Sequence, residues 1–210
     1  MVRDVWLPLV WSVSACFLVG WGTGQAQWGT DANNPTHTVN RLVASISRQP
    51  RLVASSDKPS VAASLDAALA LIDLRGVSQK TLGQHWTQLQ PTEQDEFMAL
   101  FAQLLIRIAF PQSAAFFQEL AVTVSGERIR GPEATVSTYV KHATEGQIDI
   151  DYRLIQQDSG WLVSDIELDG VSLSRNLRAQ FHQIIRQDSY LELLRRMREK
   201  LEHAIAASAS

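Results

Sequence analysis

The chain has 210 residues, of which 45% are hydrophobic and 20% are charged, and its formal net charge is -3 at pH 7. This composition predicts a packed core and excludes general disorder. The slightly acidic balance argues against a nucleic-acid-binding protein, which usually carries a strongly basic face. The length fits one domain with a processed end.

Residues 1–26 have the features of a secretory signal peptide. Arg3 supplies a positive start, residues 5–19 are mainly apolar, and small residues precede Ala26 at the cleavage positions. We therefore expect cleavage after Ala26 and export to the periplasm. We divide the rest of the chain into a polar leader (27–35), one domain (36–203) and a tail (204–210).

The N-terminal segment has two other interpretations. Residues 13–16 fit a lipoprotein signal, in which Cys16 would be acylated, although the apolar run continues past this residue. An uncleaved membrane anchor is the second alternative. Cys16 is the only cysteine, so a chain cut after Ala26 has no disulfide and no thiol chemistry.

Helical periodicity dominates the first half of the chain. Apolar spacing predicts helices over 38–47, 60–72 and 79–89, and a longer helix that starts after Pro91. Thr92 and Asp95 form a capping-type start for the longer helix. Its apolar stripe consists of Phe97, Leu100, Phe101, Leu104, Leu105 and Ile108. Pro111 predicts an end or a kink near Phe110, before a short helical piece over 113–119.

Apolar and polar residues then alternate with a period of two. Strands are predicted over 121–129, 134–141, 147–156 and 161–168, joined by short turns as an antiparallel meander. Asp169 and Gly170 form a turn into a helix capped by Ser172 or Ser174, and Ser189 opens the last helix. The expected fold class is α+β: an antiparallel twisted sheet of about four strands, with N-terminal helices and two C-terminal helices.

Candidate catalytic and metal-binding patterns are weak in this sequence. The five histidines have no metal-ligand spacing, and no cysteine accompanies them. Asp149 and Asp151 share one face of a strand, which solvated sheets produce routinely. Ser172 has no evident base nearby in the sequence, so a turn or cap is the better interpretation. We predict no catalytic residue, no metal and no cofactor.

Two further patterns each have two interpretations. The C-terminal helices are basic at Arg186, Arg195, Arg196, Arg198 and Lys200, which forms either a solvated face or a docking surface for anionic lipid or acidic partners. The stripe of Phe97, Phe101 and Leu104 facing Ile148, Ile150 and Tyr152 is either ordinary core or the wall of a ligand cavity. From the pattern alone, core is favoured.

One stretch carries a family resemblance. The motifs are Gly160-Trp161-Leu162-Val163, Asp169-Gly170-Val171-Ser172-Leu173, Arg178-Ala179-Gln180-Phe181 and Ile184-Ile185-Arg186, with Leu82-Gly83-Gln84-His85-Trp86 before them and Met197-Arg198-Glu199-Lys200 after them. In this order they resemble the MlaC family, also called the toluene-tolerance auxiliary family, of periplasmic phospholipid-binding proteins. The resemblance covers roughly residues 36–202.

The resemblance implies a twisted sheet and helices that enclose an apolar cavity for acyl chains, with the head group outside. It implies a lipid-binding set consisting of Phe97, Phe101, Leu104, Leu105, Ile108, Ile148, Ile150, Tyr152, Trp161, Val163, Ile166 and Val171. Residues Ile148 and Val171 are expected on the cavity wall.

The resemblance also implies partners and a role. We expect a monomer that carries phospholipid between an outer-membrane lipoprotein complex and an inner-membrane ABC transporter with a membrane-anchored substrate-binding subunit. The alternatives are a hopanoid-associated lipid-binding relative, an α+β enzyme that uses Asp149, Asp151 or His142, and an interaction module with a solid core.

Overall fold

The computed structural model describes residues 34–47, 58–117, 120–142 and 146–208. The predicted signal peptide and nearly all of the polar leader lie outside these residues. The helices before the sheet are α1 (Pro35–Ser47), α2 (Lys58–Leu69), α3 (Leu74–Leu82), the 3-10 helix η1 (Gly83–Gln88), α4 (Pro91–Leu104), the π-helical segment η2 (Leu105–Ala109) and α5 (Phe110–Phe117). The strands are β1 (Thr123–Arg130), β2 (Glu133–His142), β3 (Gly146–Gln157), β4 (Gly160–Leu168) and β5 (Val171–Ser172), followed by α6 (Leu173–Gln187) and α7 (Tyr190–Ser208).

The predicted α+β class is confirmed, with five antiparallel strands in the order β1-β2-β3-β4-β5 instead of about four. The extra strand arises at the predicted turn. Asp169 has φ 47° and Gly170 has φ 79°, the left-handed pair that a two-residue hairpin requires. The chain therefore turns back beside β4 for two residues, where Val171 pairs with Leu168.

Both ends of the helix that was predicted over 79–89 differ in the structure. Helix α3 begins at Leu74 rather than near residue 79, because the Asp73 carboxylate accepts a hydrogen bond of 3.0 Å from the amide of Gly76. It ends at Leu82, and Gly83, which follows as the C-cap, has φ 54°. A Cβ atom at Gly83 would lie 2.8 Å from the guanidinium of Arg178, so this glycine also permits close packing of α3 on α6.

The long helix starts and continues differently from the prediction. Its cap is Gln90, whose amide donates to the Glu93 carboxylate over 2.7 Å, and not the pair of Thr92 and Asp95. It does not stop at Phe110, because the chain widens into η2, where the Phe110 amide donates to the carbonyl of Leu105. Pro111 then lies in the first turn of α5, where proline is tolerated.

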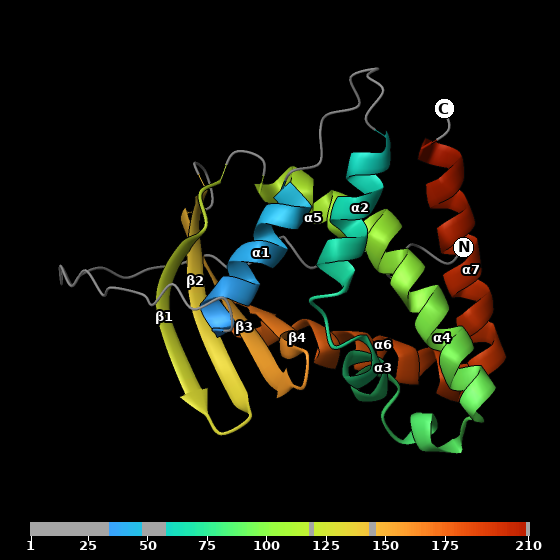
Figure 1. Cartoon of the computed structure of the whole chain (residues 1–210). Coiled ribbons are helices and arrows are strands. Elements are labelled where there is room, and N and C mark those ends of the chain that lie inside the picture. The colour runs from blue at the N-terminus through green and yellow to red at the C-terminus, as the bar shows by residue number, and fades with distance from the viewer. Residues whose placement is uncertain (1–33, 48–57, 118–119, 143–145, 209–210) are drawn as a thin grey trace. The chain divides into compact units, whose positions relative to one another are not determined.

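The elements form two packed regions (Figure 1). Helix α1 contacts β2 and β4 and packs against α2 and α5. Helix α4 packs against α7, and α6 packs against α3 and α7. The run from Pro91 to Ala115 is long and apolar enough to cross a membrane by length and composition alone. Its residues Phe97, Leu100 and Phe101 are buried within the protein.

Candidate functional site

One face of the sheet is apolar and lies against helices. We call it the inner face. Residues that lie opposite each other on neighbouring strands share a face. On the central strands, the inner face therefore carries Val136 with its partner Tyr152, and Thr138 with its partner Ile150. Fifteen buried residues form the cluster that we call the sheet core: Val39, Leu42, Ile46, Ala68, Leu71, Phe110, Ala114, Ala134, Val136, Val140, Ile150, Tyr152, Leu154, Trp161 and Val163.

A bulge on β4 keeps apolar residues on the inner face. Val163 pairs with Leu154, but the next partner of β3, Arg153, pairs with Asp165, so Ser164 is the extra residue. Without this insertion, strict alternation from Val163 would place Ile166 on the other face. The bulge therefore directs both Val163 and Ile166 inward.

The inner face becomes more exposed towards β5. One cross-strand row runs from Val124 through Thr138, Ile150 and Leu168 to Val171. In this row Ile150 is 1% exposed, Leu168 is half-buried and Val171 is 46% exposed. The hydroxyl of Thr138 donates to the carbonyl of Ile150 over 3.0 Å, so its polar group is satisfied. Val171 therefore stands at the open end of an apolar row.

Twelve partly buried apolar side chains surround the sheet core. They come from helices α1 and α2, from the link between α2 and α3, from η2, from the segment before β1 and from strands β1, β3 and β4. We call them the apolar rim: Val43, Leu65, Leu69, Ile72, Leu105, Ile106, Leu120, Val122, Val124, Ile148, Ile166 and Leu168. Apolar area left in contact with water is unfavourable, so this rim is a surface that an apolar ligand would cover.

Tyr152 places a polar atom in this apolar setting. It is 3% exposed, and burial raises the pKa of its hydroxyl far above the ordinary value. The sheet core around it is otherwise made of hydrocarbon and indole side chains.

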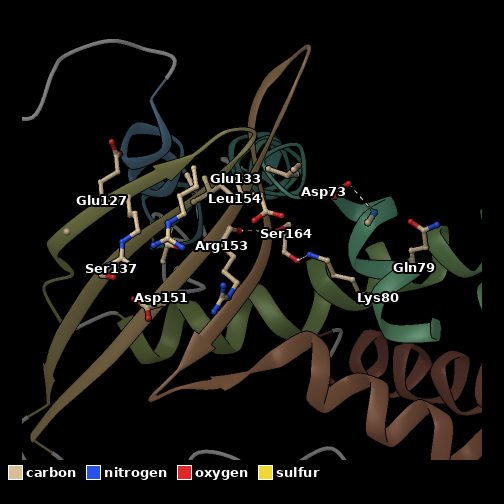
Figure 2. A pocket seen from close by; sticks show the side chains of 17 residues that line it. Asp73, Gln79, Lys80, Glu127, Glu133, Ser137, Asp151, Arg153, Leu154 and Ser164 are labelled. Atoms are coloured by element: carbon tan, nitrogen blue, oxygen red, sulfur yellow. Dashed lines mark hydrogen bonds between the residues drawn. The ribbon is translucent and has the colours of Figure 1, made fainter. Parts of the chain in front are cut away.

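The opposite, outer face of the sheet is charged and hollowed (Figure 2). Two hollows of about 750 Å³ and about 400 Å³ share Lys80 and Arg153 in their linings. Lys80 donates to the carbonyl of Ser164 over 3.1 Å, which satisfies an acceptor at the bulge. The buried carboxylate of Glu167 accepts from Arg153 at 2.9 Å and from Arg175 at 3.0 Å. Such linings suit water and ions and would not cover hydrocarbon.

The structure divides the predicted lipid-binding residues into separate groups. Ile150, Tyr152, Trp161 and Val163 lie in the sheet core, and Leu105, Ile148 and Ile166 lie in the apolar rim. Val171 is exposed at the end of the inner face. Ile108 is half-buried on η2, outside both sets.

Phe97, Phe101 and Leu104 do not face the strand residues as expected. The rings of Phe97 and Phe101 stack with centroids 5.8 Å apart, and Phe97 meets Phe181 of α6 edge-on at 6.0 Å. Leu104 is buried but does not belong to the sheet core. The reason is that α4 packs against α7 and, through Phe97, against α6, which directs its apolar stripe away from the sheet.

The cover of the sheet comes instead from helices that the predicted site omitted. Val39, Leu42 and Ile46 of α1 and Ala68 of α2 belong to the sheet core. The apolar stripe of α1 was visible in the sequence as a period of three to four residues. Nothing in that period says which layer a helix covers, so the pairing of α1 with the sheet required the structure.

The residues of the enzyme alternative do not assemble into a site. Asp149 is exposed on the outer face and accepts from the side-chain amide of Gln147 over 2.8 Å. The side chain of His142 lies outside the described residues. Ser172 caps α6, since its oxygen accepts from the amide of Arg175 at 3.1 Å and its hydroxyl donates to Asp165 at 2.6 Å. Within the described ranges, no three His, Cys, Asp or Glu residues lie close enough to hold a metal ion.

The arginines of the C-terminal helix α7 are largely paired with carboxylates of the same chain. Arg195 pairs with Glu192 and Glu199, Arg196 pairs with Asp188 and Glu192, and Arg198 pairs with Glu96 of α4. These contacts favour the interpretation of a solvated, ion-paired face over a free cationic docking surface.

The fold and site define an α+β protein whose sheet presents one apolar face to helices and one charged face to water. The chain belongs to the MlaC family, because residues 37–199 match the family described as "MlaC protein". Among solved structures, it is similar to a phospholipid-binding protein from Ralstonia solanacearum in complex with a phospholipid. The TM-score is 0.66 and the identity 24%, over 81% of this chain and 96% of that one. At this identity the likeness shows the fold alone. No curated protein matches the chain.

Proposed function

We propose that the protein is a periplasmic carrier that holds the acyl chains of a phospholipid between the inner face of the sheet and the helices that cover it. The observation that carries this proposal is the apolar rim, twelve incompletely covered side chains around one buried cluster. Val171, at the exposed end of the same face, marks the side at which the ligand meets water. The charged outer face remains in solvent.

Energetics explain why such a carrier needs a large apolar surface. Two long acyl chains contain about thirty CH2 groups, and each costs ~0.8 kcal/mol in water, so exposed transit would cost roughly 24 kcal/mol. A carrier must therefore cover most of both tails. The apolar rim and the sheet core supply side chains of the right kind, and the two polar hollows of the outer face do not.

Two comparisons support phospholipid as the ligand. The chain is a member of the MlaC family, and the Ralstonia protein with a similar fold was solved with a phospholipid bound. The resemblance drawn from the sequence extends this to a role: shuttling lipid between an outer-membrane lipoprotein complex and an inner-membrane ABC transporter. Carriage requires no bond to be made or broken, and the candidate Ser172 is engaged as a helix cap.

The first test is mass spectrometry of organic extracts from protein purified from the periplasm without detergent. We expect phospholipid at close to one molecule per chain. Hopanoid alone would assign the protein to a different lipid class. The absence of any lipid, together with turnover of a soluble substrate that Asp149→Ala abolishes, would overturn the proposal in favour of an enzyme.

The same sample tests export. A signal peptide that ends at Ala26 predicts a mature chain that begins at Gln27 and contains no cysteine. Intact-mass measurement is expected to give this species. An acylated Cys16, or residues 1–26 still attached, would show that the protein is anchored to a membrane instead of moving between two of them.

A further inference from the structure

The smaller hollow of the outer face, of about 400 Å³, gathers more positive than negative charge. It lies between α3, strands β3 and β4, and the first turns of α6. Its charged lining consists of the cations Lys80, Arg153, Arg175 and Arg178 and the carboxylates Asp165 and Glu167. Four positive charges minus two negative charges leave an excess of two. A chain whose formal net charge is -3 therefore concentrates positive charge in one concave place.

Both carboxylates of this hollow are engaged by other groups of the protein. Glu167 is buried, and its two oxygens accept from Arg153 at 2.9 Å and from Arg175 at 3.0 Å. Asp165 is held at the start of α6, where it accepts from a backbone amide at 3.1 Å and from the Ser172 hydroxyl at 2.6 Å. Among the described residues, no ion pair joins either carboxylate to the other two cations of the hollow.

Arg178 is held in place although it has no anionic partner. Its side chain forms no hydrogen bond or ion pair within the part of the chain that the structure describes. Its Nη2, Cζ and Nε atoms lie 2.8, 2.9 and 3.0 Å from the position of a Cβ at Gly83, which places the flat face of the guanidinium over this glycine. A guanidinium that packs through its face still presents its N–H donors along its edge.

The other three cations of the hollow keep donors open as well. Lys80 donates to the carbonyl of Ser164 at 3.1 Å, and its ammonium group has two further hydrogens. Arg153 and Arg175 each contact Glu167 through one terminal nitrogen, out of the five N–H donors that a guanidinium carries. Like charges around one hollow repel each other, so an anion bound there would be stabilising.

We propose that this hollow is a binding site for a phosphate group, held by its four cations. Guanidinium groups match the oxygen edges of a phosphate, and the excess of two positive charges equals the charge of a phosphate dianion. A hydrocarbon ligand would gain nothing from such a lining. The phosphate belongs either to a lipid head group, since α6 follows directly after the exposed Val171, or to a free anion. The site itself does not depend on the proposed function, and only its lipid source does.

The first test is calorimetric titration of the lipid-free mature chain with inorganic phosphate, at an ionic strength kept constant with sodium chloride. We expect one saturable site per chain, and Arg178→Gln should weaken it about tenfold. Arg186→Gln is the matched control, because Arg186 is exposed on the same helix and does not line the hollow. It should bind as wild type does. Absence of saturable binding to wild type, or equal weakening by both variants, overturns the inference.

Melting temperatures give a second readout. Wild type should melt higher in phosphate than in chloride of equal ionic strength, because a ligand of the folded state stabilises it. Arg178→Gln should lose most of this increase, whereas Arg186→Gln should keep it. Phosphate also stabilises proteins without a site, by exclusion from their surface. An equal increase in wild type and Arg178→Gln would therefore overturn the inference.

Two lipids distinguish the sources of the phosphate. Wild type and Arg178→Gln are titrated with a short-chain phosphatidic acid and with a diacylglycerol of the same chains. A head-group source predicts that the variant weakens only the binding of phosphatidic acid, by about tenfold. A free-anion source predicts that both lipids bind the two proteins alike, while inorganic phosphate still requires Arg178. Equal weakening with both lipids would indicate a packing role of Arg178 and overturn the inference. Failure of wild type to bind either lipid would overturn the proposed function, and the titration with inorganic phosphate would still decide the site.

Discussion

Ile148 and Ile150 lie two residues apart on the same face of β3, but water reaches them to different extents. Ile150 is 1% exposed in the sheet core, whereas Ile148 is half-buried in the apolar rim. We predict that Ile148→Glu stays folded, because its charge can reach solvent, but loses most of its bound lipid. A glutamate at position 150 is buried without a partner, which costs several kcal/mol and should unfold the protein. Circular dichroism and lipid extraction on the same samples measure both effects.

Val171 extends this comparison to β5. At 46% exposure it has room for a charge, so Val171→Glu should keep a melting temperature within a few degrees of wild type and should retain little lipid. Full lipid retention in both Ile148→Glu and Val171→Glu would move the lipid site away from this end of the sheet. Unfolding of both would show that these residues are ordinary core.

At the scale of elements, the junction of β5 and α6 depends on one side chain. Ser172 accepts from the amide of Arg175 and donates to Asp165, which in turn accepts from the amide of Ser174 at 3.1 Å. We predict that Ser172→Ala lowers the free energy of unfolding by about 1–2 kcal/mol. Thermal or urea unfolding measures the change.

The control for this variant is Ser159→Ala, in the exposed turn before β4, where the structure shows no hydrogen bond of the side chain. It should change stability by less than about 0.5 kcal/mol. Equal stability of the two variants would mean that the Ser172 cap does not hold this junction together.

Helix α7 carries a pH-dependent ion-pair cluster. Hydrogen bonds from Arg195, and then from Arg196, lower the pKa of Glu192 from 4.5 to about 2. Because the folded-state pKa is the lower one, the stabilisation is complete above about pH 4.5 and is lost as the pH falls towards 2. We predict that Glu192→Gln melts below wild type at pH 7, and that this difference shrinks between pH 4.5 and 2. The difference is small, because exposed pairs are screened by solvent and salt.

Glu202→Gln provides the control, because Glu202 is exposed on the same helix and forms no ion pair within the described residues. Its melting temperature should follow wild type across the whole pH range. A Glu192→Gln difference as large at pH 3 as at pH 7 would show that the carboxylate does not act through its charge.

The elements differ in how far the sequence could predict them. The strands and the two C-terminal helices follow strict periodicity and were predicted to within a few residues, because binary patterning reflects burial directly. The Ser164 bulge and the π-helical segment η2 were not predicted. In the sheet, the extra residue Ser164 lets Ile166 lie opposite Tyr152. In the long helix, η2 lets the chain continue as a helix into Pro111. Such insertions depend on tertiary pairing, which a single sequence does not display.

At the scale of the whole molecule, a ligand that fills the site must stabilise it. Ligand at about 100 times its Kd adds about 2.7 kcal/mol, and 1 kcal/mol shifts the melting temperature of a domain of this size by about 2–4 °C. We therefore predict that phospholipid raises the melting temperature of the delipidated protein by about 5–10 °C. Calorimetry with and without short-chain phospholipid measures the shift. Unchanged melting at saturating lipid would contradict a site inside the sheet core and apolar rim.

The positions of the candidate residues in the fold were predicted in part. The strand residues that were expected on the apolar face, such as Ile150 and Val163, lie there, since alternation assigns faces once one face is apolar. The helix residues Phe97 and Phe101 were assigned to the same site but pack with Phe181. An apolar stripe shows that one side of a helix is buried, but it does not show which element packs against that side. The choice between α6 and the sheet is made by tertiary packing.

Strand β1 forms one edge of the sheet, and among the described strands none pairs with its outer side. A free edge of this kind presents unpaired backbone groups that another chain can extend, which leads to aggregation. Here a bulge between Val124 and Gly126 interrupts the edge, and the charged residues Arg128 and Arg130 follow it. Natural sheets use such irregularities and charges to block edge-to-edge association. The β1 edge is therefore a poor template for pairing with the sheet of a second copy of the chain.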